Sequence, residues 1–120
     1  MESEHVTIPE NSNIEMLLKN YMRSQIGTGF NRLRFFARHI GVHPRKVQRI
    51  LAAENISFRE TLIDTKCEIA QHYLINPSNT LAEISLILGY ENVSAFSRAF
   101  SKRTKGISPS QFRLDPRLTT

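Results

Sequence analysis

The chain has 120 residues, which fits one domain able to bury about two thirds of the surface of its unfolded chain. Its single cysteine, Cys67, excludes an internal disulfide and favours a reduced, cytoplasmic location. No apolar run approaches the roughly 18 residues of a membrane helix, and the acidic first residues do not resemble a secretory signal. We therefore expect no membrane partner.

The net charge of +5 is distributed unevenly along the sequence. Successive blocks of thirty residues carry net charges of −2, +5, −2 and +4. Lys and Arg concentrated in this way can neutralise DNA phosphates and release counterions. A solvated basic surface would give the same charge pattern, so charge alone leaves both interpretations open.

The first part of the chain predicts two helices. Residues 1–11 are polar and without helical period, and we expect a loose arm or linker stub there. A capping box beginning at Ser12 opens the first helix, which ends at the glycines of residues 27–29. Asn31 can cap the second helix, and Gly41 ends it.

The middle of the chain predicts a short helix and then a long one. Pro44 suits a helical first turn, and Asn55 tolerates the left-handed conformation that ends a helix. A capping box at Ser57 opens the longest pattern, which continues to about Ile75 before Pro77. Because its apolar residues cover more than one face, we expect a linker helix that packs on both neighbouring lobes. These residues are Phe58, Leu62, Ile63, Cys67, Ile69, Ala70, Tyr73 and Leu74.

The last part predicts three more helices. A capping box at Thr80 opens a helix that ends at Gly89, and Asn92 can cap the next, through Arg103. A further box at Ser108 opens a short last helix. Since no segment alternates like a strand for long, the predicted fold class is all-α, with about seven helices.

Two segments of the chain repeat each other. Residues 33–41 are echoed by residues 81–89, and with one inserted residue 47–51 align with 96–100. A helix, a glycine, a turn and a second helix used twice predict two helix-turn-helix units joined by the linker helix. The expected boundaries are 12–56 for the first unit, 57–76 for the linker, 77–114 for the second unit, within a domain of 12–114, and 115–120 for a tail.

The second helix of each unit should present a polar face opposite its apolar one. In the first unit, Val47, Ile50 and Leu51 point inward, and the outward positions are Arg45, Gln48, Arg49 and Ala52. In the second, Phe96, Ala99 and Phe100 point inward, and the outward positions are Ser94, Ser97, Arg98 and Ser101. Arginine can bind both acceptors of guanine, and glutamine both groups of adenine, so these faces suit the DNA major groove. A solvated amphipathic helix has the same spacing, but the equivalent arginines Arg49 and Arg98 favour groove insertion.

Phosphate contacts are expected from helix N-termini and from flanking basic residues. The candidates are Arg34, Arg38, Lys102, Arg103, Ser108 and Ser110. For each of them alone, a plain surface charge or a structural cap is favoured over an indispensable contact. A linker helix of about nineteen residues spans about 28 Å, and successive major-groove faces lie about 34 Å apart. One monomer could therefore read two adjacent grooves, with the DNA bent where the reach falls short.

A set of residues at fixed spacings lies between Ala82 and Arg113: Ile84, Gly89, Tyr90, Ser94, Phe96, Ser97, Arg98, Ala99, Phe100, Gly106, Ser108, Pro109, Phe112 and Arg113. This set closely resembles the signature of AraC/XylS-type transcription regulators, and the resemblance covers roughly residues 14–114. It implies a seven-helix domain that binds promoter DNA and usually activates transcription through RNA polymerase. It also implies base contacts by Arg45, Gln48, Arg49, Ser94, Ala95, Ser97 and Arg98, of which the helical period does not select Ala95.

Three positions depart from the pattern of this family. Lys66 stands where the linker helix usually has arginine, so a bidentate bond there would be lost. Asn55 replaces the usual glycine, which the left-handed tolerance of asparagine can absorb. The stretch from Phe100 to Gly106 is one residue longer, which leaves the register of the last helix open.

Members of the family mostly carry a separate effector-binding or dimerisation domain before this one. We therefore expect the chain to be the C-terminal fragment of a longer regulator. A complete stand-alone regulator is the alternative.

Other functions receive less support from the sequence. His39 and His43 are four residues apart, but Gly41 and Pro44 interrupt the helix between them, so we expect no metal and no cofactor. Cys67 on the packed linker helix favours an inert buried thiol over a reactive one. No nucleophile and base are arranged for catalysis, so we expect no enzyme. A helical protein-interaction module remains the main competitor, and RNA is disfavoured because its major groove excludes a helix.

Overall fold

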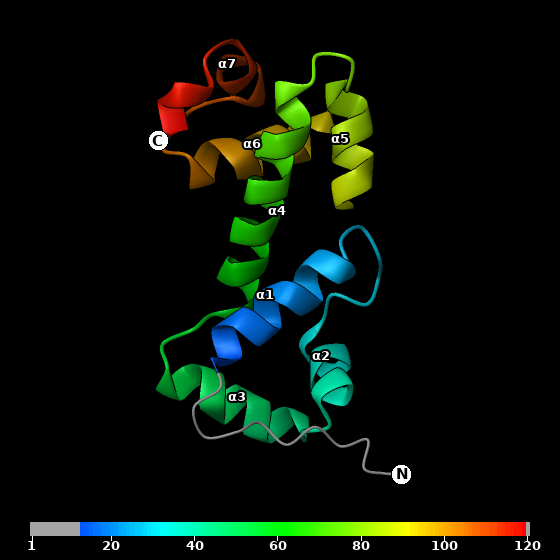
Figure 1. Ribbon diagram of the computed structural model, residues 1–120, viewed down its shortest axis with the longest axis vertical. Helices are drawn as coiled ribbons and strands as arrows, with labels where there is room; N and C mark the ends of the chain where they lie inside the picture. The colour runs from blue at the N-terminus through cyan, green and yellow to red at the C-terminus, as the bar shows by residue number, and fades with distance from the viewer. Residues whose placement is uncertain (1–12, 120) are drawn as a thin grey trace. The chain divides into compact units, whose positions relative to one another are not determined.

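The computed structural model describes residues 13–119, and this part of the chain contains helices and no strand (Figure 1). The helices are α1 (Ile14–Ser24), α2 (Leu33–Ile40), α3 (Pro44–Ala53), α4 (Phe58–Ile75), α5 (Leu81–Leu88), α6 (Val93–Arg103), α7 (Pro109–Leu114) and the 3-10 helix η1 (Pro116–Thr119). The prediction of an all-α fold with seven α-helices is therefore confirmed. The expected arm at 1–11 lies outside the described residues. No helix among the described residues is long and apolar enough to cross a membrane.

The helices form two compact units, a first unit up to Leu62 and a second unit from Ile63. The boundary between them falls inside α4 rather than at its ends. The first turn of α4 belongs to the first unit, where Phe58 and Leu62 pack against the buried cluster. The remainder of α4 belongs to the second unit and buries Cys67 there.

The first unit is built around one apolar cluster from α1, α2 and α3. Its buried members are Ile14, Leu18, Tyr21, Met22, Phe36, Ala37, Ile40, Val47 and Leu51. The turn between α2 and α3 depends on Gly41, whose φ of 71° is left-handed. The N–H of Val42 then donates to the carbonyl of Ala37 at 3.0 Å, which closes the end of α2. The predicted left-handed residue after α3 is also present, since Asn55 has a φ of 58°.

Two helix starts in the first unit differ from the predicted ones. Asn13 caps α1, because its Oδ1 accepts from the N–H groups of Glu15 and Met16, whereas Ser12 lies outside the described residues. The N-cap of α2 is Arg32, which makes no side-chain cap hydrogen bond, so the prediction of an Asn31 cap is wrong. Asn31 instead donates from Nδ2 to the carbonyl of Met22 at 3.0 Å, and this bond satisfies a carbonyl at the end of α1.

The second unit repeats the same plan with predicted caps. Thr80 forms a complete capping box with Glu83, and the side chain of Asn92 accepts from Ala95 at the start of α6. Gly89 ends α5 in the left-handed region with a φ of 85°.

The core of the second unit contains a row of aromatic rings. Tyr90, Phe96, Phe100 and Phe112 contact one another in succession, at centroid distances of 5.8, 5.9 and 5.8 Å. Such tilted and edge-to-face pairs add to the stabilisation from burial alone. The row links the α5–α6 turn to α6 and α7.

The stretch between Phe100 and Gly106, which the resemblance suggests is one residue longer, ends in a left-handed loop. Lys105 and Gly106 have φ values of 62° and 97°, and the N–H of Gly106 donates to the carbonyl of Ser101 at 2.7 Å. The last helix then begins at Pro109, with Ser108 and Gln111 in a capping box. Because Phe112 is buried and contacts Phe100, α7 keeps its apolar face inward.

Burial along α4 differs in detail from the predicted apolar pattern. Leu62, Ile63, Ile69 and Tyr73 are only half-buried, as is Ala99 on α6. The buried positions of α4 include two threonines, Thr61 and Thr65, and the Thr61 hydroxyl donates to the carbonyl of Ser57 at 2.8 Å. A threonine that bonds within its own helix can be buried at little cost, which an apolar count does not anticipate.

Replacing Leu62 with alanine should destabilise the first unit. Because Leu62 packs on the cluster but is half-buried, we expect a loss near the lower end of the range for Leu→Ala, about 2 kcal/mol. Leu86→Ala is the matched control, since Leu86 is 77% exposed and should change stability by at most about 0.5 kcal/mol. Urea unfolding followed by circular dichroism measures both. Equal midpoints for Leu62→Ala and the unsubstituted chain would contradict the packing assigned to Leu62.

Candidate nucleic-acid interface

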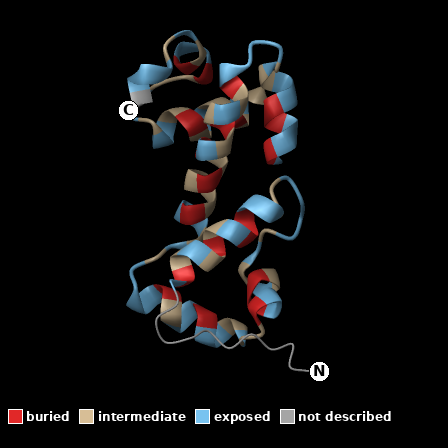
Figure 2. Cartoon of the chain, in the orientation of Figure 1, coloured by how far each residue is buried: buried red, intermediate tan, exposed pale blue. Residues whose placement is uncertain are grey.

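The outward face of α3 has the composition that the sequence predicts. Its four expected positions are all exposed: Arg45, Gln48, Arg49 and Ala52. On the opposite side Val47 and Leu51 are buried, at 0% and 3% exposure. Figure 2 shows that this helix carries both buried and exposed segments. The burial of one face therefore turns two arginines and a glutamine to solvent.

The start of α3 is held by a cap that the sequence analysis did not identify. The side chain of His43 accepts from the N–H of Arg45 through Nδ1 at 3.1 Å, and Pro44 occupies the first turn. Lys46 is a further exposed cation on this helix that periodicity alone did not select. Its signal in the sequence is a third basic residue within five positions.

The outward face of α6 is smaller and less charged. Ser94 and Arg98 are exposed, whereas Ala95, Ser97 and Ser101 are half-buried. The N–H of Ala95 donates to Oδ1 of Asn92 at 2.8 Å, so only the methyl group of Ala95 is available to a ligand. This face could approach a ligand closely but offers one long side chain.

A cavity of about 490 Å³ lies beside the start of α3 and brings two of the predicted phosphate contacts together. It is lined by Arg34, Phe35, Arg38, Val42 and Pro44. The Arg34 guanidinium lies 4.7 Å from the centroid of the Phe35 ring, a cation–π contact that holds part of the side chain in place. Both arginines are exposed, and within the described chain neither forms an ion pair with a carboxylate. Two guanidinium groups so arranged can bind an anion such as a phosphate.

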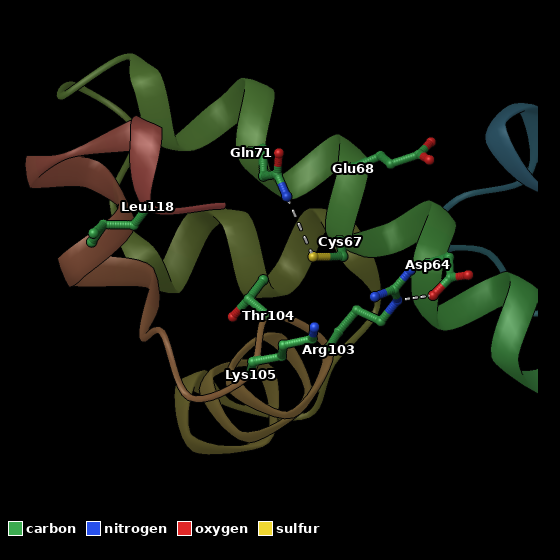
Figure 3. Close-up of a pocket in the computed structure, with 8 residues that line it drawn as sticks. All are labelled: Asp64, Cys67, Glu68, Gln71, Arg103, Thr104, Lys105 and Leu118. Carbon is green, nitrogen blue, oxygen red and sulfur yellow. Dashed lines mark hydrogen bonds and ion pairs between the residues drawn. The ribbon is translucent and has the colours of Figure 1, made fainter. Parts of the chain in front are cut away.

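The predicted phosphate contacts of the second unit have different surroundings. Lys102 is exposed, but Arg103 forms an ion pair with Asp64 of α4 (Figure 3). The hydroxyl of Ser108 accepts from the N–H of Gln111 at 3.1 Å and can still donate, and Ser110 is exposed. Lys102 and Ser110 are therefore exposed to a ligand, whereas Arg103 and Ser108 already interact with other residues of the unit.

Cys67 lies at a polar cavity of about 370 Å³ in the second unit (Figure 3). The cavity is lined by Asp64, Cys67, Glu68, Gln71, Arg103, Thr104, Lys105 and Leu118. The thiol is buried and free, and it accepts a hydrogen bond from Gln71 Nε2 at 3.7 Å. Burial raises the pKa of the Cys67 thiol, which keeps it protonated and weakly nucleophilic. These surroundings support the interpretation of Cys67 as an inert buried residue.

His39 and His43 have separate surroundings. The ring of His39 contacts Tyr21 at a centroid distance of 5.1 Å, and His43 caps α3. Within residues 13–119, no group of three or more His, Cys, Asp or Glu side chains could hold a metal ion.

Comparison with known proteins identifies the family. A model of the family described as "Helix-turn-helix domain", of the AraC type, matches residues 36–115. An uncharacterized HTH-type transcriptional regulator of Mycobacterium tuberculosis is 41% identical over 63% of the chain and 22% of that relative. The urease operon transcriptional activator of Escherichia coli is 35% identical over 62% of the chain and 25% of that relative. The aligned part of the chain thus spans about a quarter of the length of these relatives.

A solved structure supports the same fold. The crystal structure of a DNA-binding transcriptional dual regulator from Escherichia coli K-12 matches with a TM-score of 0.80 at 17% identity, covering 87% of this chain and 98% of that one. Together with two helix-turn-helix units and a polar outward face on the second helix of each, these matches place the chain in the AraC-type family of DNA-binding transcription regulators.

Proposed function

We propose that the chain binds duplex DNA sequence-specifically by inserting α3 and α6 into the major groove and thereby regulates transcription at a promoter. The observation that carries this proposal is the repeated face: each helix buries an apolar side and exposes an arginine at the equivalent place, Arg49 and Arg98. An interaction module of the same fold would expose apolar residues on these two faces.

The two helices supply different base contacts. On α3 the readers are Arg45, Gln48 and Arg49, whose long side chains suit guanine and adenine edges. On α6 they are Ser94, Ala95, Ser97 and Arg98, of which the small residues allow close approach and the alanine methyl can contact thymine. We expect α3 to contribute more hydrogen bonds to bases than α6.

Phosphate contacts fix the register of each helix on the duplex. Arg34 and Arg38 serve this role in the first unit, beside the start of α3. In the second unit the candidates are Lys102, Arg103, Ser108 and Ser110. Of these, Arg103 also forms an ion pair with Asp64.

The arrangement on the promoter follows from the length of the linker helix. We expect two boxes about one helical turn apart, read by one chain in adjacent grooves. Activation through RNA polymerase is the expected outcome, consistent with a relative named as an activator. The aligned residues make up only 22% and 25% of these relatives, which supports a further effector-binding or dimerisation domain in the intact regulator. A cytoplasmic site of action is expected for a protein that binds promoter DNA.

Selection of binding sites from a random duplex library with the purified chain tests this function. Two enriched boxes about one helical turn apart are expected. A single enriched box would mean that the second unit mainly contacts the DNA backbone. No enrichment would contradict sequence-specific binding by this chain and favour an interaction module.

Arg49→Ala should weaken binding to the enriched duplex by about 1–3 kcal/mol and relax base preference within one box, because a bidentate base contact is lost. Arg59→Ala is the matched control, since Arg59 is exposed on α4 outside the proposed reading face. Fluorescence anisotropy with the enriched and a random duplex measures both variants. Equal losses for Arg49→Ala on the two duplexes would identify Arg49 as a phosphate contact instead.

Arg34→Ala and Arg38→Ala should each lower affinity for enriched and random duplexes alike. Because each removes one phosphate contact, the slope of log K against log salt should decrease in magnitude by about 1 per substitution. Titrations at several salt concentrations give this slope. A slope unchanged in both variants would remove these two residues from the phosphate contacts.

A further inference from the structure

Lys66 of α4 has unusual surroundings for a lysine. Its side chain is half-buried, and its Nζ lies 4.6 Å from the centroid of the Tyr90 ring. No carboxylate pairs with Lys66 among the described residues, and burial lowers the pKa of its ammonium group. An ammonium group removed from water is costly unless another interaction compensates, and the face of an aromatic ring supplies one.

Tyr90 belongs to the turn that leads into α6. It follows the left-handed Gly89, and its N–H donates to the carbonyl of Ser85 at 2.9 Å. Two residues later, Asn92 caps α6. The ring of Tyr90 contacts Phe96, the first buried ring of α6, at a centroid distance of 5.8 Å. The ring that receives Lys66 is therefore fixed both to the turn and to the helix that the turn starts.

The first unit has no such contact at the equivalent place. Val42 follows Gly41 there, and an aliphatic side chain offers no ring face to a cation. The two reading faces also differ in what they require. Arg45, Gln48 and Arg49 can adjust their long side chains, whereas serines reach a base only if the helix backbone is held closely in position.

We propose that Lys66 and Tyr90 are positioning residues for DNA recognition by α6, with the ammonium group on the ring fixing the turn from which that helix starts. The inference rests on the proposed function, since it assigns a role within the same DNA-binding surface. This role depends on the ammonium group that Lys66 places on the ring. Because a guanidinium group can stack on an aromatic ring as well, arginine there should serve the same role.

The test measures discrimination between the two boxes of the duplex enriched by the unsubstituted chain. The Arg98→Ala variant identifies the box read by the second unit. It is the box whose scrambling no longer weakens binding of that variant. For Lys66→Met, which keeps an apolar stem without the charge, we expect about 3- to 30-fold weaker binding to the enriched duplex. Scrambling the box of the second unit should then have little further effect, while scrambling the other box still weakens binding as before.

Conservative variants separate positioning from a general loss of structure. Lys66→Arg should restore affinity to within about twofold, and Tyr90→Phe should keep it, since both retain a cation on a ring. Tyr90→Leu should resemble Lys66→Met, and the double variant should lose little more than either alone, because both remove the same contact.

Two results would overturn the inference. One is an equal loss for Lys66→Met on enriched and random duplexes, which would make Lys66 a direct phosphate contact. The other is an unchanged set of amide NMR resonances for residues 91–96 in Lys66→Met without DNA, since the contact would then not reach the start of α6. The NMR result decides the structural link even if the unsubstituted chain enriches no duplex, an outcome that contradicts the proposed function itself.

Discussion

The left-handed glycine between two helices is the constraint on which each unit depends. Gly41 and Gly89 have φ values of 71° and 85°, a region that residues with a Cβ rarely adopt. In both units the next residue donates its N–H to a carbonyl five positions earlier, at 3.0 Å in one and 2.9 Å in the other. The end of the first helix and the start of the second are thus fixed by one geometry. This shared turn geometry also determines which side of the second helix remains exposed to solvent.

The two units differ in the residues that cap and hold the start of the second helix. In the first, His43 accepts from Arg45 and is followed by Pro44. In the second, Asn92 accepts from Ala95, and the preceding Tyr90 bears the Lys66 ammonium group on its ring. The charged face of α3 has side chains long enough to tolerate small shifts of the helix. The serine-rich face of α6 depends more on where its backbone lies.

Much of this architecture could be predicted from local sequence signals, because caps and left-handed terminators act within a few residues. The boxes at Thr80 and Ser108 and the cap at Asn92 are examples. Asn31 shows the limit, since its side chain bonds a residue nine positions away instead of its own helix. Local sequence rules cannot predict whether this side-chain amide caps its own helix or bonds to a distant backbone carbonyl.

The candidate site shows the same division between local and distant information. The exposed face of α3 follows from helical periodicity, and its burial pattern agrees at all four predicted positions. The contacts of Lys66 with Tyr90 and of Arg103 with Asp64 join residues 24 and 39 positions apart. Side chains so far apart in the sequence meet only through tertiary packing. Helical periodicity therefore could not predict that Lys66 and Arg103 already contact other side chains of the same unit.

The net charge of the two basic stretches therefore overstates their similarity. In the second unit, Arg103 pairs with Asp64, Arg117 pairs with Asp115, and Arg113 donates to the backbone carbonyls of Leu74 and Asn79. In the first unit, Arg34, Arg38, Arg45 and Arg49 are all exposed, and in the described chain none forms an ion pair with a carboxylate. Counterion release scales with the number of cations that reach phosphates. The salt-dependent part of DNA affinity should accordingly come mainly from the first unit. The contribution of the second unit should depend more on the close fit of α6 to the groove.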